Sequence, residues 1–172
     1  MIETRPDTTI YRGQRIPGGL VAVFVCDDAA GWAAPLVHFV RHSHGLGWGD
    51  SGPGAADLAL SLLVDALGPA ALCPMCDGRR RVVWLGPDAP VDPVPYNPIR
   101  HAGADPELVT DCLCSDGLRS LAYREFACAV VSGWPDTWTI SRAQILDFLT
   151  TLYPPEGELP EWLQDVVTGA RS

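Results

Sequence analysis

GPGAADLALSLLVDALGP, residues 52–69, is the stretch of sequence that decides the fold. Proline suits the first turn of a helix and Gly-Pro ends one, so the sequence predicts a helix over residues 53–67. Apolar residues cover most of its circumference, and Asp57, Ser61 and Asp65, spaced four apart, form a narrow polar stripe. A helix of this kind is packed on more than one side. We therefore expect it to be the central, buried helix of the fold.

Three β-rich runs precede this helix. Residues 8–12 and 20–26 are separated by Pro17-Gly18-Gly19, a turn signal that predicts a hairpin. Residues 35–43 alternate in hydrophobicity and predict a third strand.

The C-terminal part combines helical and strand patterns. Residues 118–130 follow helical spacing, and a short strand is predicted at 137–140. Ser141 and Gln144 have the spacing of a capping box, which predicts that a helix begins there. Residues 158–167 predict a short amphipathic helix.

Composition excludes several kinds of chemistry. All 12 basic residues counted as Lys or Arg are arginines, so a Schiff-base lysine and a phosphate-loop lysine are excluded. The net charge of -9 opposes binding to phosphate backbones and makes a basic partner easier to accommodate. Abundant Ala, Gly and Pro without Lys is typical of a GC-rich genome, such as that of an actinobacterium or its phage.

Length and hydropathy restrict the class of protein to which the chain can belong. The 172 residues fit one globular domain. No apolar run approaches the ~18 residues that span a bilayer, and the first residues contain no apolar signal core. We therefore expect an acidic, soluble, cytoplasmic protein without a membrane partner.

Four cysteines carry the strongest chemical signal. Cys73 and Cys76 form a Cys-x-x-Cys knuckle, and Cys112 and Cys114 form a second close pair, each pair followed shortly by glycine. Two close pairs at the ends of one segment are what a tetrahedral four-cysteine zinc site requires. Four thiolates leave no open position, so the zinc is expected to be structural. The first knuckle also resembles half of the zinc repeats of DnaJ-type chaperones, whereas the second departs from their spacing.

Other uses of the cysteines remain open. The metal could take His101 or Cys128 as a ligand, the thiolates could hold an iron–sulfur cluster, or they could be buried free thiols. Cys26 and Cys128 fall on a predicted strand and helix, and we expect both to be small buried hydrophobic residues.

These patterns together predict one α+β domain over residues 1–172. Its small antiparallel sheet packs on the central buried helix and two further helices, and residues 72–117 form a zinc-binding insertion within it.

The loop before the central helix contains a protease-like motif. Residues 49–53 resemble the nucleophile loop of trypsin-like serine proteases, but they are one glycine short and lack the upstream His and Asp of that fold. Ser51 is instead predicted to be the helix N-cap. The same helix start is a candidate anion site, formed by Ser51 and Gly52 with His42 and His44.

Several motifs in the first and last thirds of the chain point to one family. They are Tyr11-Arg12-Gly13, Gly47-Trp48-Gly49, Ser51-Gly52-Pro53, Leu58-Ala59-Leu60, Leu62-Leu63, Tyr123-Arg124-Glu125-Phe126, Trp138, Ile140 and Ile145. Together they resemble a bacterial and phage family, domain of unknown function 6166, whose signature is similar to Gly-Tyr-Gly-Gly-Ser-Gly-Pro-Ala-Gln-Leu-Ala.

The chain departs from that signature at three positions. Trp48 replaces the tyrosine, Asp50 replaces the glycine before the serine, and Asp57 stands where the pattern has Gln once two extra residues follow Pro53. The resemblance covers residues 8–68 and 118–150. It implies a shared fold unit and a phage or mobile-element setting, and it supplies no mechanism.

Three functions follow from these observations. The first is a non-enzymatic, zinc-stabilised protein-interaction module that binds another protein as a phage or mobile-element accessory. The second is a nucleic-acid-binding module, because an arginine run and a tryptophan follow the knuckle: Arg79, Arg80, Arg81 and Trp84. The third is a small enzyme that uses His42, His44, Asp50 and Ser51, although no residue is assigned a catalytic role.

Overall fold

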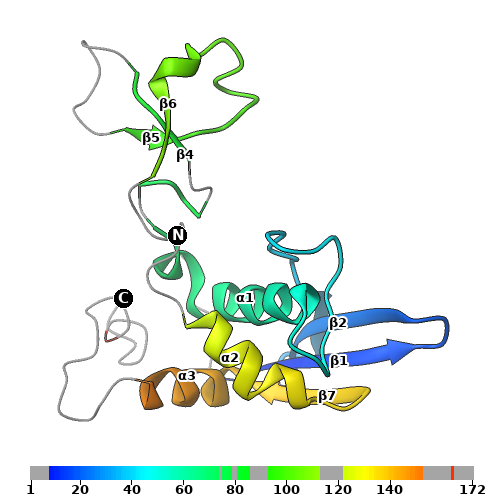
Figure 1. Ribbon diagram of the computed structural model, residues 1–172. Helices are drawn as coiled ribbons and strands as arrows, with labels where there is room; N and C mark the ends of the chain where they lie inside the picture. The colour runs from blue at the N-terminus through cyan, green and yellow to red at the C-terminus, as the bar shows by residue number, and fades with distance from the viewer. Residues whose placement is uncertain are drawn as a thin grey trace. The chain divides into compact units, whose positions relative to one another are not determined.

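The computed structural model describes residues 8–73, 75–78, 81–85, 93–112, 122–152 and 164 (Figure 1). The chain divides into two compact units, of which the first combines residues 1–68 and 122–172 and the second comprises residues 69–121. The segment 72–117, predicted as an insertion, lies within the second unit.

The first unit is built on a four-stranded antiparallel sheet in the order β3-β2-β1-β7. Its strands are β1 (Thr9–Ile16), β2 (Leu20–Asp27), β3 (Trp32–Pro35) and β7 (Thr137–Ser141). The predicted hairpin is confirmed, because β1 and β2 pair along their whole length up to Ile16 and Leu20. β1 also pairs with β7, so the sheet joins the two ends of this unit.

The described part of the first unit includes three helices with defined bounds, and the class is α+β as predicted. They are α1 (Pro53–Leu67), α2 (Tyr123–Ala129) and α3 (Arg142–Thr151), with the short 3-10 turn η3 (Val131–Gly133). A second 3-10 turn, η1 (Gly68–Ala71), follows α1 at the boundary between the two units. α1 is the central helix that its sequence predicts, and Leu58, Leu60 and Leu62 are each 0% exposed. The capping box of α3 is also confirmed: the Gln144 amide donates to Ser141 Oγ and the Ser141 amide donates to Gln144 Oε1.

One face of the sheet lies in the core, and on the other face Cys26 of β2 is also buried. Residues that alternate along the strands lie in the core, namely Tyr11, Gly13, Val23, Val25, Trp138 and Ile140. Their neighbours are exposed, namely Arg12, Gln14, Phe24, Thr137 and Thr139. Because alternate residues of a strand point to opposite faces, the helices must cover one face, and Figure 1 shows α1, α2 and α3 on the same side.

The predicted third strand is wrong. It was expected at residues 35–43, whereas β3 ends at Pro35 and residues 36–43 form no strand. Leu36 continues the pairing with Val23, and the next backbone amides are bound by side chains of α1 instead of a neighbouring strand. The alternating pattern thus describes a loop with one side against a helix.

Other local expectations also need correction. The N-cap of α1 is Gly52 and not Ser51, and the Gly52 amide donates to Asp50 Oδ1 at 2.8 Å. Cys26 is buried in β2 as predicted, but Cys128 is exposed on α2. The helix expected at 118–130 begins at Tyr123 among the described residues, and the one expected at 158–167 lies outside them except for Gln164.

The second unit contains a small antiparallel sheet in the order β5-β4-β6. Its strands are β4 (Arg81–Val83), β5 (Val94–Pro95) and β6 (Val109–Asp111), and the 3-10 turn η2 (Pro106–Leu108) precedes β6. Across the residues placed in the structure, no helix has the length and apolar character needed to cross a membrane.

Candidate functional site

The knuckle at Cys73 and Cys76 folds as a tight turn. The Asp77 amide donates to the Cys73 carbonyl at 2.8 Å, which closes the turn around the two sulfur atoms. Asp77 and Gly78 have positive φ angles of 49° and 70°. Gly78 adopts this left-handed backbone readily, which explains why the knuckle ends in glycine.

The small sheet brings Cys112 to this knuckle. β4 begins at Arg81, shortly after Cys76, and Arg81 pairs with Asp111 at the end of β6. Cys112 follows Asp111 directly, so the β4–β6 pairing places a residue distant in sequence beside the turn.

The three thiols form one compact group. The sulfur atoms of Cys73, Cys76 and Cys112 all lie within 4.8 Å of one another, and the group could hold a metal ion. The Cys73 and Cys112 sulfurs are 3.9 Å apart. A disulfide requires roughly 2.05 Å, whereas thiolates at ~2.3 Å from one tetrahedral ion lie about 3.8 Å from each other. The observed separation therefore fits ligands of a shared ion.

These cysteines also belong to a buried hydrophobic cluster of their unit. Cys73, Cys76 and Val82 form one buried cluster against which Cys112 packs. Cys76 is completely buried and Cys112 is half-buried. A metal bound by these thiols would therefore sit within a packed cluster and would add its binding free energy to the stability of the unit.

The three-thiol group includes neither of the two alternative ligands, His101 and Cys128. Cys114 falls outside the described residues. His101 is not part of the three-thiol group: its Nδ1 accepts a hydrogen bond from the Asn97 amide at 3.0 Å, and its ring lies against Tyr96. Cys128 belongs to the first unit and is exposed on α2.

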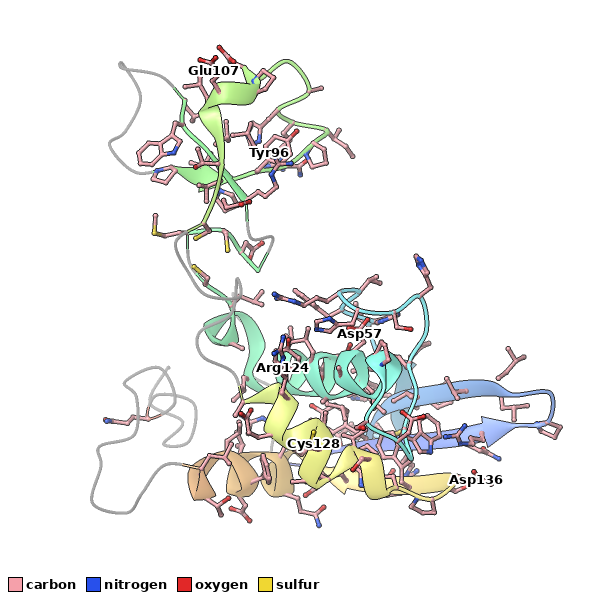
Figure 2. The ribbon with its side chains drawn as sticks, viewed as in Figure 1. Asp57, Tyr96, Glu107, Arg124, Cys128 and Asp136 are labelled. Carbon is pink, nitrogen blue, oxygen red and sulfur yellow. The ribbon has the colours of Figure 1, made fainter. Side chains whose placement is uncertain are left out.

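The predicted nucleic-acid contacts are described in part. Arg79 and Arg80 lie outside the described residues. The Arg81 guanidinium carbon lies 5.3 Å from the centre of the Tyr96 ring, which Figure 2 labels. Trp84 is 43% exposed, and its indole N–H donates to Thr110 Oγ1.

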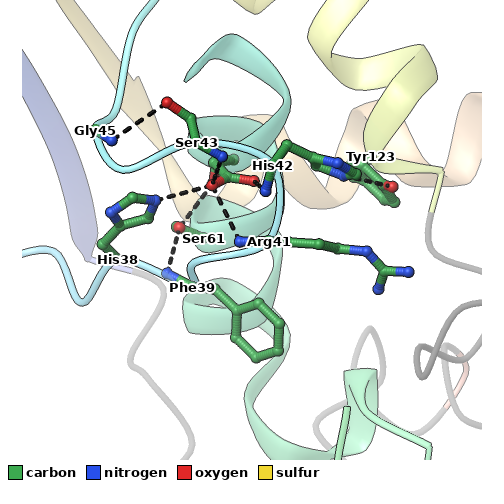
Figure 3. A network of polar contacts seen from close by, with 9 residues as sticks. His38, Phe39, Arg41, His42, Ser43, Gly45, Ser61 and Tyr123 are labelled. Atoms are coloured by element: carbon green, nitrogen blue, oxygen red, sulfur yellow. Dashed lines mark hydrogen bonds and ion pairs between the residues drawn. The ribbon is translucent and has the colours of Figure 1, made fainter. Parts of the chain in front are cut away.

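A second polar arrangement lies in the first unit around Asp57, on α1. Figure 3 shows the loop residues that surround this carboxylate. It accepts hydrogen bonds from the amides of Arg41, His42 and Ser43 at 2.9–3.1 Å, and His38 Nε2 lies 3.0 Å from Oδ2. Asp57 is 0% exposed, so nearly all its hydrogen bonding is with the loop.

The remaining polar residues of α1 act in the same way. Ser61 Oγ accepts the Phe39 amide and donates to the Asp57 carbonyl. Asp65 accepts a hydrogen bond from the hydroxyl of buried Tyr11 at 2.9 Å. The polar stripe of the central helix thus anchors segments that are distant in sequence.

The ionised form of Asp57 is favoured by its partners. Burial by itself raises the pKa of a carboxyl group. The hydrogen bonds from the Arg41 amide, His38, and the His42 and Ser43 amides act in the opposite direction, and together they lower the pKa of Asp57 below its ordinary value of 3.8.

The residues of the predicted anion site and of the predicted enzyme loop have different partners in the structure. The His42 ring stacks on Tyr123, and His42 Nε2 lies 3.0 Å from the Tyr123 hydroxyl. His44 and Ser51 are exposed, and Asp50 binds the Gly52 amide. Among the described side chains, no hydrogen bond joins either histidine to Ser51.

Asp57 is the residue whose role sequence reasoning missed. Its signal was present, because a helix that is apolar on nearly every side has no solvent face for a carboxylate. The hydrogen-bond partners of Asp57 could not be predicted from the sequence, because they are mostly backbone amides of a loop and no residue type identifies them.

The fold and site define an α+β protein whose second unit carries a three-thiol group that could hold a metal ion. Residues 11–76 match the model of a family described as "Family of unknown function (DUF6166)", which confirms the resemblance to that family. The match spans β1 to the first knuckle and includes Asp57 and the loop bound to it. No curated protein and no solved structure gave a match to the chain.

Proposed function

We propose that the protein is a non-enzymatic, zinc-stabilised protein-interaction module. One structural zinc ion would be held by Cys73, Cys76, Cys112 and Cys114, and this ion would fix the fold of the unit formed by residues 69–121. A phage or mobile-element setting remains part of this proposal, and composition supports it.

The observation that carries the proposal is the 3.9 Å separation of the Cys73 and Cys112 sulfurs. Zinc is the ion that four thiolates of a closed tetrahedral site most often bind. A closed site leaves no position for substrate or water, so the ion would stabilise the fold without taking part in a reaction.

The interaction role is supported by apolar side chains next to the small sheet. Trp84, Leu85 and Leu108 are 43%, 54% and 38% exposed. They lie close together, because the Trp84 amide donates to the Leu108 carbonyl at 2.9 Å. Exposed tryptophan is enriched among residues that dominate binding energy at protein interfaces. The net charge of -9 favours a basic partner.

Elemental analysis of the purified full-length protein tests the zinc assignment. We expect about one zinc per chain, and a loss of metal in Cys112→Ser. Cys128→Ser is the matched control, because that thiol is exposed on α2, and this variant should retain its zinc. Protein purified without metal, or with iron and sulfide, would contradict the assignment.

Affinity purification from the source cells tests the interaction role. Partners should be recovered with the wild type and lost with Trp84→Ser. Trp32→Ser is the control, since Trp32 is 37% exposed and lies in the other unit. Partners that bind Trp84→Ser as well as the wild type would exclude this surface.

Nucleic-acid binding is the second candidate function, favoured by the exposed indole of Trp84, which follows the arginine run in the sequence. Bases stack on aromatic side chains, and arginines neutralise phosphates. Fluorescence anisotropy with single-stranded oligonucleotides across a salt titration tests it. Binding that weakens steeply with salt and is lost in Trp84→Ser would favour this function over protein binding.

A further inference from the structure

We propose that Cys112 is a site of oxidation by hydrogen peroxide, and that this oxidation joins Cys112 to Cys73 in a disulfide and releases the metal ion. The disulfide follows from the positions and the exposure of the sulfur atoms alone. Release of an ion rests on the function proposed above, in which these thiolates hold zinc. The disulfide and the release of the ion are therefore measured separately.

The first argument is that the three thiols differ in their access to solvent. All three are free, but Cys76 is 0% exposed and Cys73 is 6% exposed, whereas Cys112 is only half-buried. Oxidation of a cysteine depends on its exposure and on its thiolate character. A thiol that ligates a metal is deprotonated, so Cys112 meets both conditions in the metal-bound protein. Peroxide therefore reaches Cys112 before it reaches the other two sulfur atoms.

The second argument is that a second thiol lies within reach of Cys112. The Cys73 sulfur is 3.9 Å from the Cys112 sulfur, and a disulfide requires roughly 2.05 Å. The two atoms must therefore approach each other by roughly half of their separation. Cys112 is the first residue beyond β6, whose pairing with β4 ends at Asp111. It can move towards Cys73 without breaking that pairing.

The reaction consumes one hydrogen peroxide for each disulfide. The Cys112 thiolate attacks one peroxide oxygen, an S–O bond forms as the O–O bond breaks, and hydroxide leaves. The Cys73 thiolate then attacks the Cys112 sulfur, an S–S bond forms as the S–O bond breaks, and a second hydroxide leaves. The two sulfur atoms lose two electrons, which the peroxide gains. A metal ion held by these thiolates loses two anionic ligands, so its affinity falls and it is released.

Two other described cysteines each lack one of these conditions. Cys26 lies in β2 and is only 4% exposed, so peroxide has little access to it. Cys128 is exposed, but it belongs to the other unit and is not part of the three-thiol group. We therefore expect the intramolecular disulfide to form selectively at Cys112.

Peroxide treatment of the full-length, zinc-loaded Cys128→Ser protein tests the proposal. This substitution removes the exposed thiol of α2, through which two chains could otherwise be joined. Peptide mapping without reductant should find Cys112 linked to Cys73, and Cys26 should remain reduced as the internal control. Chymotrypsin cleaves after Leu113, which separates Cys112 from Cys114 in the map. A chromogenic chelator should detect about one zinc released per chain, and dithiothreitol should restore zinc binding.

Cys112→His separates the role of a ligand from that of an oxidised thiol. Imidazole also binds zinc but cannot form a disulfide, so peroxide should release zinc about tenfold more slowly, or slower still, in this variant. If the variant does not hold zinc, the disulfide map of the Cys128→Ser protein decides the question alone.

The outcomes distinguish this inference from the proposed zinc site. The inference is overturned if peroxide leaves Cys73 and Cys112 reduced, if Cys112 is linked to a different cysteine, or if the disulfide forms while the zinc is retained. Reduced protein that contains no zinc would contradict the zinc site instead, and the same peptide map would still test the disulfide.

Discussion

The indole of Trp138 lies against the backbone of Gly13, its cross-strand partner between β7 and β1. A Cβ atom placed on Gly13 would lie 2.2 Å from Trp138 Cε2. The Trp138 ring stacks on Trp134 at 4.0 Å and meets buried Trp48 edge-on. The absence of a side chain at Gly13 thus leaves space for a cluster of tryptophan rings that packs on the buried face of the sheet.

Gly13→Ala is therefore expected to destabilise the protein strongly. Trp138 is held by two other tryptophans and cannot shift freely, so the added methyl group should cost about 3 kcal/mol of unfolding free energy. Urea denaturation measures the change. Gly133→Ala is the control, because nothing lies within 4 Å of its Cβ position, and an equal loss in both variants would contradict this account.

Asp57→Asn should also destabilise the first unit. The amide side chain keeps one acceptor oxygen but adds an N–H group that faces loop amides, so about 2–3 kcal/mol should be lost. Hydrogen exchange at the amides of Arg41, His42 and Ser43 should become faster. Asp147→Asn, at an exposed site on α3, should change neither quantity, and slow exchange in Asp57→Asn would show that another group holds the loop.

Acid should weaken the protein through the same carboxylate. Because the folded-state pKa of Asp57 is lowered, its contribution to stability is fully present above the unfolded-state pKa of about 3.9 and is lost as the pH falls through the folded-state pKa. Urea denaturation from about pH 7 to about pH 3 should show this loss. The unfolding free energy of Asp57→Asn should depend less on pH than that of the wild type. Identical profiles of unfolding free energy against pH for the two proteins would contradict the assignment of this effect to Asp57.

Removal of metal should act on one unit only. After chelation, amides of β4 and β6 should exchange faster with solvent, because the cysteine group that joins them to the knuckle would lose the proposed ion. Amides of β1 and β7 should remain protected and serve as the internal control. Equal loss of protection in both sheets would mean that the two units do not fold separately.

Sequence reasoning succeeded where the determining contacts are local. The capping box of α3 uses Ser141 and Gln144, three residues apart, and the ends of α1 are set by Pro53 and Gly68-Pro69. The clustering of Cys73, Cys76 and Cys112 also followed from spacing, because cysteine has few alternative roles in such pairs.

It failed where the contacts are distant. Residues 36–43 alternate as a strand does, but Asp57 supplies their hydrogen-bond acceptor from α1, and nothing local distinguishes the two outcomes. Cys128 follows helical spacing, yet only the packing of α2 decides which side of the helix faces solvent. His42 was grouped with Ser51 by proximity in sequence, whereas its ring contacts Tyr123, 81 positions away.

The pairing of β1 with β7 determines the order in which the protein can form during translation. β1 ends at Ile16, but its partner strand ends at Ser141, so the first sheet stays incomplete until most of the chain has left the ribosome. Residues 69–121 emerge earlier and contain the three described strands of their own small sheet. The cysteine unit can therefore assemble while the nascent β1–β2 hairpin still has an open edge.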